Sequence, residues 1–196
     1  MNMAGVVLAG GQSSRFGRPK MFEIFEEEPL YKKSLKALQG NSLHPIIIAT
    51  NAELQPNFAE ENVVFHIETT LHQGPLFALQ NVMQHFPDVD WFVVLASDMP
   101  FIDADFIRKM LNQIDDRYEA IVPKQNSKIQ PLAAIYRRSA LPILDSIIQQ
   151  HKRSMKDLLM ELKVCYVEFN EDCLTFVNIN TQQDLLEIQK KEKNHE

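Results

Sequence analysis

Cysteine is scarce in this sequence of 196 residues, because only Cys165 and Cys173 are present. They stand eight positions apart, without a CxxC pair and without a histidine at ligand spacing, which argues against a zinc site or a disulfide framework. The apolar run GVVLA, residues 5–9, is too short for a membrane span or for the core of a signal peptide. We therefore expect reduced thiols in a cytoplasmic protein that has no membrane partner.

An excess of basic residues is also missing. The chain carries 20 Lys and Arg against 26 Asp and Glu, which gives a formal net charge of −6. Nucleic-acid binding needs a basic face that displaces counterions from phosphates, so this charge argues against a nucleic-acid partner. No Pro-rich, Gly-rich or Ser-rich linker and no repeat divides the chain, and 45% of its residues are hydrophobic. We expect a single domain over residues 1–196, with a sizeable core.

Short apolar runs alternate with helical patterns along much of the chain. The expected strands are rich in Val and Ile and cover residues 5–9, 45–50, 63–67, 91–96 and 120–123. The expected helices cover residues 29–39, 75–86 and 103–114, and Asp103 is the expected N-cap of the last one. This alternation indicates βαβ units and hence an α/β fold, with a mostly parallel central sheet and helices on both of its faces.

The carboxyl-terminal half of the chain is less regular. Residues 131–136 and 164–169 have the composition of strands, and antiparallel pairing is one option for both. The sequence TQQD at residues 181–184 resembles a capping box that opens the last helix. The charged tail that begins at Lys190 is expected to be a fraying helix end.

The stretch LAGGQSSRFGRPK, residues 8–20, directly follows the first expected strand. Gly10 and Gly11 allow the backbone to approach a ligand closely with its N–H groups facing outward, and Arg15 and Lys20 add two cations. Neither GxxxxGK[ST] nor GxGxxG is present, which excludes a P-loop and a dinucleotide fingerprint. We interpret the stretch as a polyphosphate-binding loop. The alternative is a solvated connection whose basic residues only face water.

Polar residues also follow two further expected strands, where ligands bind in open α/β sheets: ATN, residues 49–51, follows the second strand, and SDMP, residues 97–100, follows the fourth. Asp98 follows the fourth strand, and a single well-placed carboxylate is enough for Mg²⁺, which keeps waters and phosphate oxygens as its other ligands. As the alternative, Asp98 caps a turn before Pro100. Gly74 and Pro75 begin a helical pattern whose preceding backbone could lie against a planar base, or they are only a helix start. His72 has no partner at ligand spacing and is expected at the surface.

Five motifs, in their order and spacing, resemble those of molybdenum cofactor guanylyltransferases over nearly the whole chain. They are LAGG-x-S-x-R-x-G-x-x-K at residues 8–20, GPL at 74–76, SDMPF at 97–101, QPLAAIY at 130–136 and FVNINTQQDL at 176–185. The resemblance implies a Rossmann-like nucleotidyltransferase fold and an enzyme that transfers GMP from Mg-GTP to the terminal phosphate of molybdopterin, with release of pyrophosphate. A molybdopterin carrier and an acceptor molybdoenzyme are further expected partners.

The alternatives are a cytidylyltransferase for the same pterin, an enzyme acting on a sugar 1-phosphate or isoprenoid phosphate, and a nucleotide-sensing subunit without activity. Cytidylyl relatives tend to read LAAG rather than LAGG, and Gly11 with Gly74, Pro75 and Leu76 favours the larger purine.

The resemblance also implies roles for individual residues. The GTP-binding positions of the family are matched by Leu8, Ala9, Gly10, Gly11, Lys20, Asn51, Glu68, Gly74, Pro75, Leu76 and Asp98. Arg15, Lys20 and Asp98 would be catalytic, with the two cations on the triphosphate and Asp98 on Mg²⁺. The pterin-binding positions are matched by Arg153, Asn178 and Asn180. The domain would then divide into a GTP-binding part, about residues 1–100, and a pterin-binding part, about residues 101–196.

Overall fold

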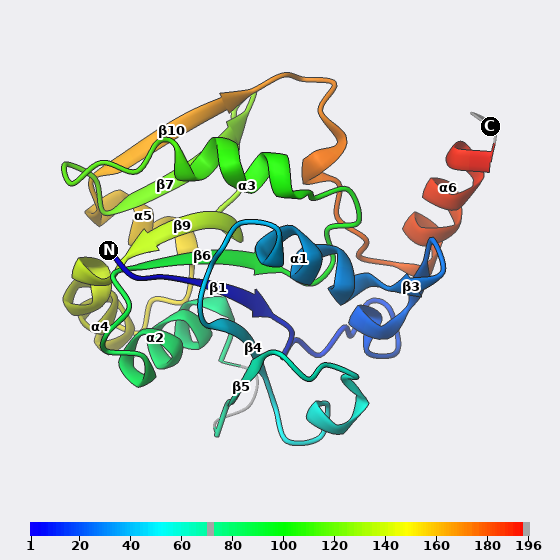
Figure 1. The fold of residues 1–196 in the computed structure, drawn as a ribbon, viewed down its shortest axis with the longest axis horizontal. Helices are drawn as coiled ribbons and strands as arrows, with labels where there is room; N and C mark the ends of the chain where they lie inside the picture. The colour runs from blue at the N-terminus through cyan, green and yellow to red at the C-terminus, as the bar shows by residue number, and fades with distance from the viewer. Residues whose placement is uncertain (70–72, 194–196) are drawn as a thin grey trace.

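The computed structural model describes residues 1–69 and 73–193, so the predicted surface position of His72 lies outside the described residues. Figure 1 shows one central sheet with helices packed against it. Its strands are β1 (Met3–Leu8), β4 (Ile46–Thr50), β5 (Val64–Ile67), β6 (Trp91–Ala96), β7 (Ala120–Gln125), β8 (Lys128–Ile129), β9 (Ala133–Arg137) and β10 (Val164–Phe169). They are arranged in the order β10-β7-β9-β6-β1-β4-β5, and β8 pairs with β7. A small separate hairpin consists of β2 (Ile24–Phe25) and β3 (Glu28–Pro29).

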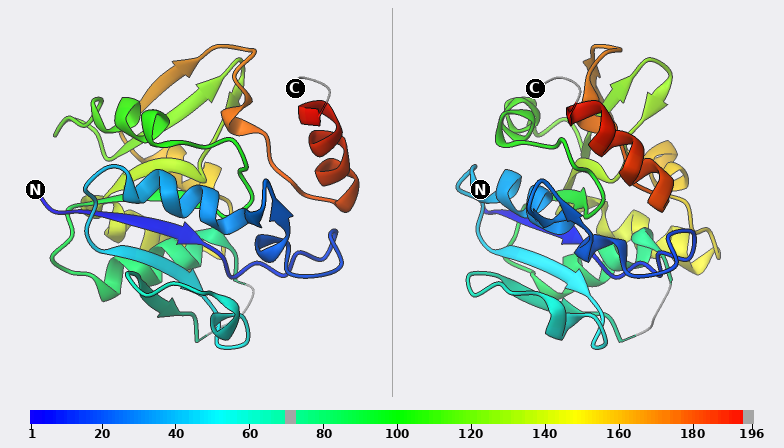
Figure 2. Two further views of the ribbon diagram at one scale, coloured as in Figure 1. Left: turned by 45° about the vertical axis from the view of Figure 1, so that its right-hand side comes forward. Right: turned by 90° about the vertical axis from the view of Figure 1, so that its right-hand side faces the viewer.

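All α-helices except the last one form two layers around the sheet. The α-helices are α1 (Leu30–Gln39), α2 (Pro75–His85), α3 (Ala104–Leu111), α4 (Leu141–Gln149), α5 (Met155–Glu161) and α6 (Gln182–Lys193). Helices α1 and α3 cover one face of the sheet, and α2, α4 and α5 cover the other (Figure 2). The single-domain, mostly parallel α/β fold predicted from the sequence is therefore confirmed. Within the described residues, no helix is both long enough and apolar enough to cross a membrane.

The central strands are apolar on both faces because both faces are covered. In β1, Val7 packs into the core under α1 and α3, whereas its neighbour Val6 packs into the core under α2 and α4. In β6, Val93 and Val94 divide in the same way, and all four side chains are at most 1% exposed. This two-sided burial explains why the sequence shows continuous apolar runs instead of an alternating pattern.

The strand directions confirm one of the two antiparallel options and correct the other. Strands β5, β4, β1 and β6 run parallel, and β9 is antiparallel to both β6 and β7, as the sequence allowed for this region. Strand β10 instead pairs parallel with β7, so antiparallel pairing was wrong for residues 164–169. These directions place the end of β9 and the start of β10 at the same edge of the sheet, and the chain covers that interval with two helices, α4 and α5.

Both capping interactions predicted from the sequence are present. The Phe106 amide donates to the Asp103 Oδ1 atom at 2.8 Å, which caps α3, although α3 ends at Leu111 and not at residue 114. The TQQD stretch forms a reciprocal capping box, because the Asp184 amide donates to the Thr181 hydroxyl at 3.1 Å and the Thr181 amide donates to Asp184 Oδ2 at 2.8 Å. Helix α6 continues to Lys193.

A buried serine ties helix α1 to the carboxyl end of β6. Ser34 is fully buried, and its hydroxyl donates to the Ala96 carbonyl at 2.7 Å. Ala96 is the last residue of β6 and is followed directly by Ser97 and Asp98. The hydroxyl therefore fixes the strand end from which the Asp98 side chain projects.

We expect Ser34→Ala to lower the free energy of unfolding by about 1–2 kcal/mol, because a buried carbonyl loses a hydrogen-bond donor. Urea unfolding followed by circular dichroism measures this change. The matched control is Ser146→Ala, at an exposed position within α4, which should stay within about 0.5 kcal/mol of the wild type and which corrects for the helix propensity of alanine. Equal effects of the two substitutions would contradict the assigned role of the buried hydroxyl.

Candidate functional site

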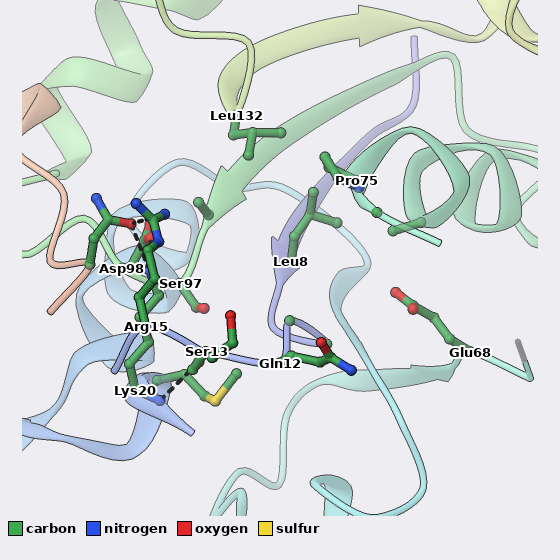
Figure 3. Close-up of a pocket in the computed structure, with 18 residues that line it drawn as sticks. Leu8, Gln12, Ser13, Arg15, Lys20, Glu68, Pro75, Ser97, Asp98 and Leu132 are labelled. Carbon is green, nitrogen blue, oxygen red and sulfur yellow. Dashed lines mark hydrogen bonds and ion pairs between the residues drawn. The ribbon is translucent and has the colours of Figure 1, made fainter. Parts of the chain in front are cut away.

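A pocket of about 380 Å³ opens at the carboxyl ends of β1 and β6 (Figure 3). From the predicted set, its lining includes Leu8, Gly10, Gly11, Arg15, Lys20, Glu68, Gly74, Pro75, Asp98 and Asn180. The lining also contains residues to which sequence reasoning gave no role: Gln12, Ser13, Ser14, Met21, Ala78, Ala96, Ser97 and Leu132. The basic loop after β1, Asp98 after β6 and the helix start at Gly74 and Pro75 therefore converge on one cavity, whereas Asn51, which follows β4, does not line it.

Ser13 and Phe16 anchor the basic loop between β1 and the short 3-10 helix η1 (Lys20–Phe22). The amides of Phe16 and Gly17 both donate to the Ser13 carbonyl, at 2.8 and 3.0 Å, and the Lys20 amide donates to the Ser13 hydroxyl at 3.2 Å. Gly17 has a φ of 86°, which glycine adopts at low cost. The Phe16 ring is buried in an apolar cluster with Leu30. The loop therefore holds Lys20 in a defined place rather than leaving it in water.

Lys20 and Asp98 form an ion pair on the side of the pocket that lies opposite Glu68. The Lys20 Nζ atom lies 2.5 Å from Asp98 Oδ2, and the two side chains are only 16% and 14% exposed. The ammonium also donates to the Ile179 carbonyl at 2.9 Å and to Asn180 Oδ1 at 3.2 Å. An ammonium group has three donors, and all three are used here. Residues from the amino-terminal loop, from the end of β6 and from the carboxyl-terminal segment thus meet at one point.

Asp98 retains one free oxygen that suits a cation. Its Oδ1 atom is buried and has no hydrogen-bond partner, whereas Oδ2 holds Lys20. Among the described residues, no three His, Cys, Asp or Glu side chains gather where they could hold a metal ion. The donor set therefore does not form an all-protein cage, and it fits an ion such as Mg²⁺ that takes most of its ligands from water and phosphate.

Arg15 lies at the edge of the same group of side chains. It is exposed, and one of its guanidinium nitrogens donates to Asn180 Oδ1 at 3.3 Å. The same oxygen accepts a hydrogen bond from Lys20, so Asn180 bridges the two cations of the loop. Figure 3 shows Arg15 close to Asp98, on the side of the pocket that lies opposite Glu68.

Glu68, which follows β5, and Gly10 meet at the other side of the pocket. A Cβ atom at Gly10 would lie 3.2 and 3.3 Å from the two carboxylate oxygens of Glu68, which is closer than side chains normally pack. The absence of a side chain at Gly10 therefore leaves the space that the Glu68 carboxylate occupies. Burial raises the pKa of Glu68 above its ordinary value of 4.5. Gly74 and Pro75 complete this side of the pocket at the start of α2.

Three residues of the predicted GTP-binding set do not line the pocket. Ala9 and Leu76 are fully buried, and both backbone groups of Ala9 already bond, its amide to the Ala49 carbonyl and its carbonyl to the Thr50 hydroxyl. The Asn51 Oδ1 atom accepts hydrogen bonds from the amides of the second and third residues that follow it, at 3.0 and 2.9 Å. Asn51 is thus a local turn cap, and its contact with a nucleotide stays a prediction.

A second cavity of about 390 Å³ adjoins the first one. The two cavities share Ala96, Asp98, Leu132 and Asn180. Of the residues predicted to face a pterin, Asn178 and Asn180 line this cavity, whereas Arg153 is exposed next to the lining residue Ser154 and does not line it. Gln130, Pro131, Met155 and Lys156 were missed as lining residues, although Gln130 and Pro131 belong to the QPLAAIY motif. Both cavities draw on both parts of the chain, so the division near residue 100 remains a prediction.

Residues 5–164 match the model of a protein family described as the MobA-like NTP transferase domain. The chain belongs to this family.

Proteins with two kinds of name are similar to this NTP transferase domain. A protein of Bacillus cytotoxicus, named "Probable molybdenum cofactor guanylyltransferase", is 31% identical over 193 residues, which cover 95% of this chain and 96% of the relative. The molybdopterin-guanine dinucleotide biosynthesis protein A of Archaeoglobus fulgidus has a similar structure, with a TM-score of 0.79 at 23% identity, covering 97% of this chain and 99% of the other. A 4-diphosphocytidyl-2C-methyl-D-erythritol synthase of Anaerococcus prevotii has a TM-score of 0.78 at 10% identity, covering 98% and 96% of the two chains.

The raised pKa of Glu68 predicts a pH-dependent stability difference in this NTP transferase domain. When the folded-state pKa exceeds the unfolded one, the folded state binds more protons, so stability is lost as the pH rises through the interval above 4.5. We expect Glu68→Gln to gain stability relative to the wild type as the pH is raised from about 4 to about 7. Chemical unfolding across this range measures the difference, with the exposed Glu61→Gln as the control for loss of one charge. A difference that does not change with pH would contradict the effect of burial.

Proposed function

We propose that this NTP transferase domain transfers GMP from Mg-GTP to the terminal phosphate of molybdopterin and releases pyrophosphate. The observation that carries the proposal is the Lys20–Asp98 pair, which lies where two adjoining cavities share a wall. A transferase of this kind must bring two phosphate-bearing substrates to one point, and each cavity can take one of them. The name of the Bacillus cytotoxicus relative, which matches nearly the whole chain, supports the choice of substrates.

The first cavity fits a nucleoside triphosphate. In this arrangement the base lies toward Glu68, Gly74 and Pro75, and the phosphates run along the loop toward Lys20 and Asp98. The second cavity, with Asn178 and Lys156, receives the pterin so that its terminal phosphate approaches the α-phosphorus of GTP from the other side of Asp98. Volumes of 380 and 390 Å³ lie within the usual range for small-molecule sites.

The residues present fit a reaction that needs electrostatic stabilisation more than proton transfer. A phosphate monoester is already a competent nucleophile at neutral pH, so no general base is required. None of the described residues that line the two cavities is a histidine or a cysteine. Lys20 and Arg15 offset the repulsion between the two substrates and the charge that grows on departing pyrophosphate.

Asp98 would hold Mg²⁺ through its free Oδ1 atom. Held there, Mg²⁺ would supply positive charge against the phosphates, which is its usual contribution in phosphoryl transfer. Lys20 now occupies the other carboxylate oxygen, and the phosphates of a nucleotide offer its ammonium new acceptors. We therefore infer that Lys20 exchanges part of its contact with Asp98 for contact with the substrate.

Cytidylyl transfer is the second candidate, because the 4-diphosphocytidyl-2C-methyl-D-erythritol synthase of Anaerococcus prevotii has a similar fold. Two observations favour the larger guanine base. Among the described residues, and apart from the adjoining residues in the chain, no heavy atom lies within 4 Å of the position that a Cβ atom on Gly11 or Gly74 would take, so there is room at these two positions. The Glu68 carboxylate next to Gly10 is an acceptor that the N–H groups of guanine could reach.

A panel of GTP, CTP, UTP and ATP tests the proposal directly. We expect pyrophosphate release to be fastest with Mg-GTP in the presence of molybdopterin bound to its carrier and molybdate, and to yield the guanine dinucleotide. Mass spectrometry of the extracted pterin identifies the product. A preference for CTP or UTP would refute the guanine assignment, and GTP binding without any product would refute catalysis.

Substitution of the ion pair separates catalysis from folding. We expect Lys20→Ala and Asp98→Ala each to lower kcat/KM by roughly 10²-fold or more, because each removes charge stabilisation at the reacting phosphates. The control is Lys36→Ala, which removes an exposed lysine of α1 that pairs with Glu28. Circular dichroism should show folded protein in all three cases. Full activity of a folded Lys20 or Asp98 variant would contradict the assigned roles.

A further inference from the structure

Helix α6 packs against the basic loop and the β2–β3 hairpin rather than against the sheet (Figure 1). Leu185 and Ile179 join Phe16, Phe25 and Leu30 in a separate apolar cluster. The Gln182 side chain donates to the Phe16 carbonyl at 3.0 Å, and the Gln189 side chain donates to the Ile24 carbonyl at 3.3 Å. The carboxyl-terminal segment is thus joined to the part of the chain that presents Lys20.

The segment just before α6 supplies acceptors for both cations of the loop. The Ile179 carbonyl and the Asn180 side chain accept two of the three hydrogen bonds of the Lys20 ammonium, and Asn180 also accepts from Arg15. The Ile179 amide in turn donates to the Asp98 backbone carbonyl at 3.0 Å. The position of residues 179 and 180 therefore decides where the two cations point.

Asp184 fixes the backbone of this segment. One carboxylate oxygen, Oδ2, accepts from the Asn180 amide at 2.9 Å and from the Thr181 amide at 2.8 Å. These hydrogen bonds, with a smaller contribution from the nearby charge of Lys20, hold the pKa of Asp184 below its ordinary value, so the group is a stable acceptor at neutral pH. The bond to Asn180 lies outside the reciprocal capping pair and is not needed to cap the helix.

We propose that Asp184 is a positioning residue for the phosphate-binding cations and acts through Asn180 on Lys20 and Arg15. Its carboxylate holds the Asn180 backbone so that the side-chain oxygen of Asn180 bridges the two cations and the Ile179 carbonyl faces Lys20. This role rests on the proposed function only in that the ligand is a nucleoside triphosphate. A capping residue that serves the helix alone would affect stability and leave phosphate recognition unchanged.

The ratio of the affinities for GTP and GMP tests this role, because the cations face the outer phosphates that GMP lacks. We expect Asp184→Ala to reduce the preference for GTP by about tenfold, while GMP affinity changes little. Asp184→Asn keeps an oxygen that can accept both amide hydrogen bonds, so it should restore most of the preference. Isothermal titration of the purified full chain with each nucleotide in Mg²⁺ gives both affinities.

Thr181→Val is the matched control for helix stability. It removes the hydroxyl that accepts from the Asp184 amide and keeps both hydrogen bonds to the Asp184 carboxylate. We expect it to lower the melting temperature, as Asp184→Ala does, without changing the ratio. In a Lys20→Ala background, Asp184→Ala should have a smaller effect on the ratio than in the wild type, because the two changes act on one interaction.

Three outcomes would overturn the inference. The first is an unchanged ratio of GTP to GMP affinity in folded Asp184→Ala, and the second is an equal loss of this ratio in Thr181→Val. The third is a double variant in which the effects of Lys20→Ala and Asp184→Ala on the ratio are additive. Wild-type protein that binds neither nucleotide would contradict the proposed function as well. If another base is preferred, its triphosphate and monophosphate replace GTP and GMP, so the choice of base does not affect the result.

Discussion

The ion pair between Lys20 and Asp98 connects three parts of the chain that are far apart in sequence. Two opposite charges that are mostly withdrawn from water are stable only when each finds partners, and a lone buried charge is costly. Lys20 meets this condition with Asp98, the Ile179 carbonyl and Asn180. One ammonium group of the loop after β1 therefore bonds to both the end of β6 and the segment before α6, at one side of the pocket.

The sheet topology explains why two cavities meet at this point. Parallel strands place the residues after β1 and β6 at one edge of the sheet, where ligands bind in open α/β folds. Strand β9 is antiparallel to β6, so the segment that precedes β9 lies at this same edge, and the Ala96 amide donates to the Leu132 carbonyl at 2.8 Å. Strand β9, which runs antiparallel to both β6 and β7, thereby brings Leu132 together with Asp98 in the wall that the two cavities share, and Gln130 into the lining of the second cavity.

Much of this arrangement could be predicted from the sequence, and the parts that could not share a physical cause. Apolar runs buried on both faces give strong local signals, and the basic loop and Asp98 directly follow such runs. The direction of β10 depends on its pairing with β7, a contact between residues far apart in sequence that local patterns do not record. Asn51 has a side chain that suits a ligand or a turn equally well, and only the structure shows that it bonds to its own backbone segment. The bridging position of Asn180 likewise depends on where the chain returns after β10.

A crystal structure of the chain with Mn²⁺ and a non-hydrolysable GTP analogue would test most directly whether this ion pair organises a nucleotide site. Our account predicts an anomalous scattering peak beside Asp98 Oδ1, with the Lys20 ammonium in contact with a phosphate oxygen. A metal ion bound away from Asp98, or a nucleotide whose phosphates do not contact Lys20, would contradict it.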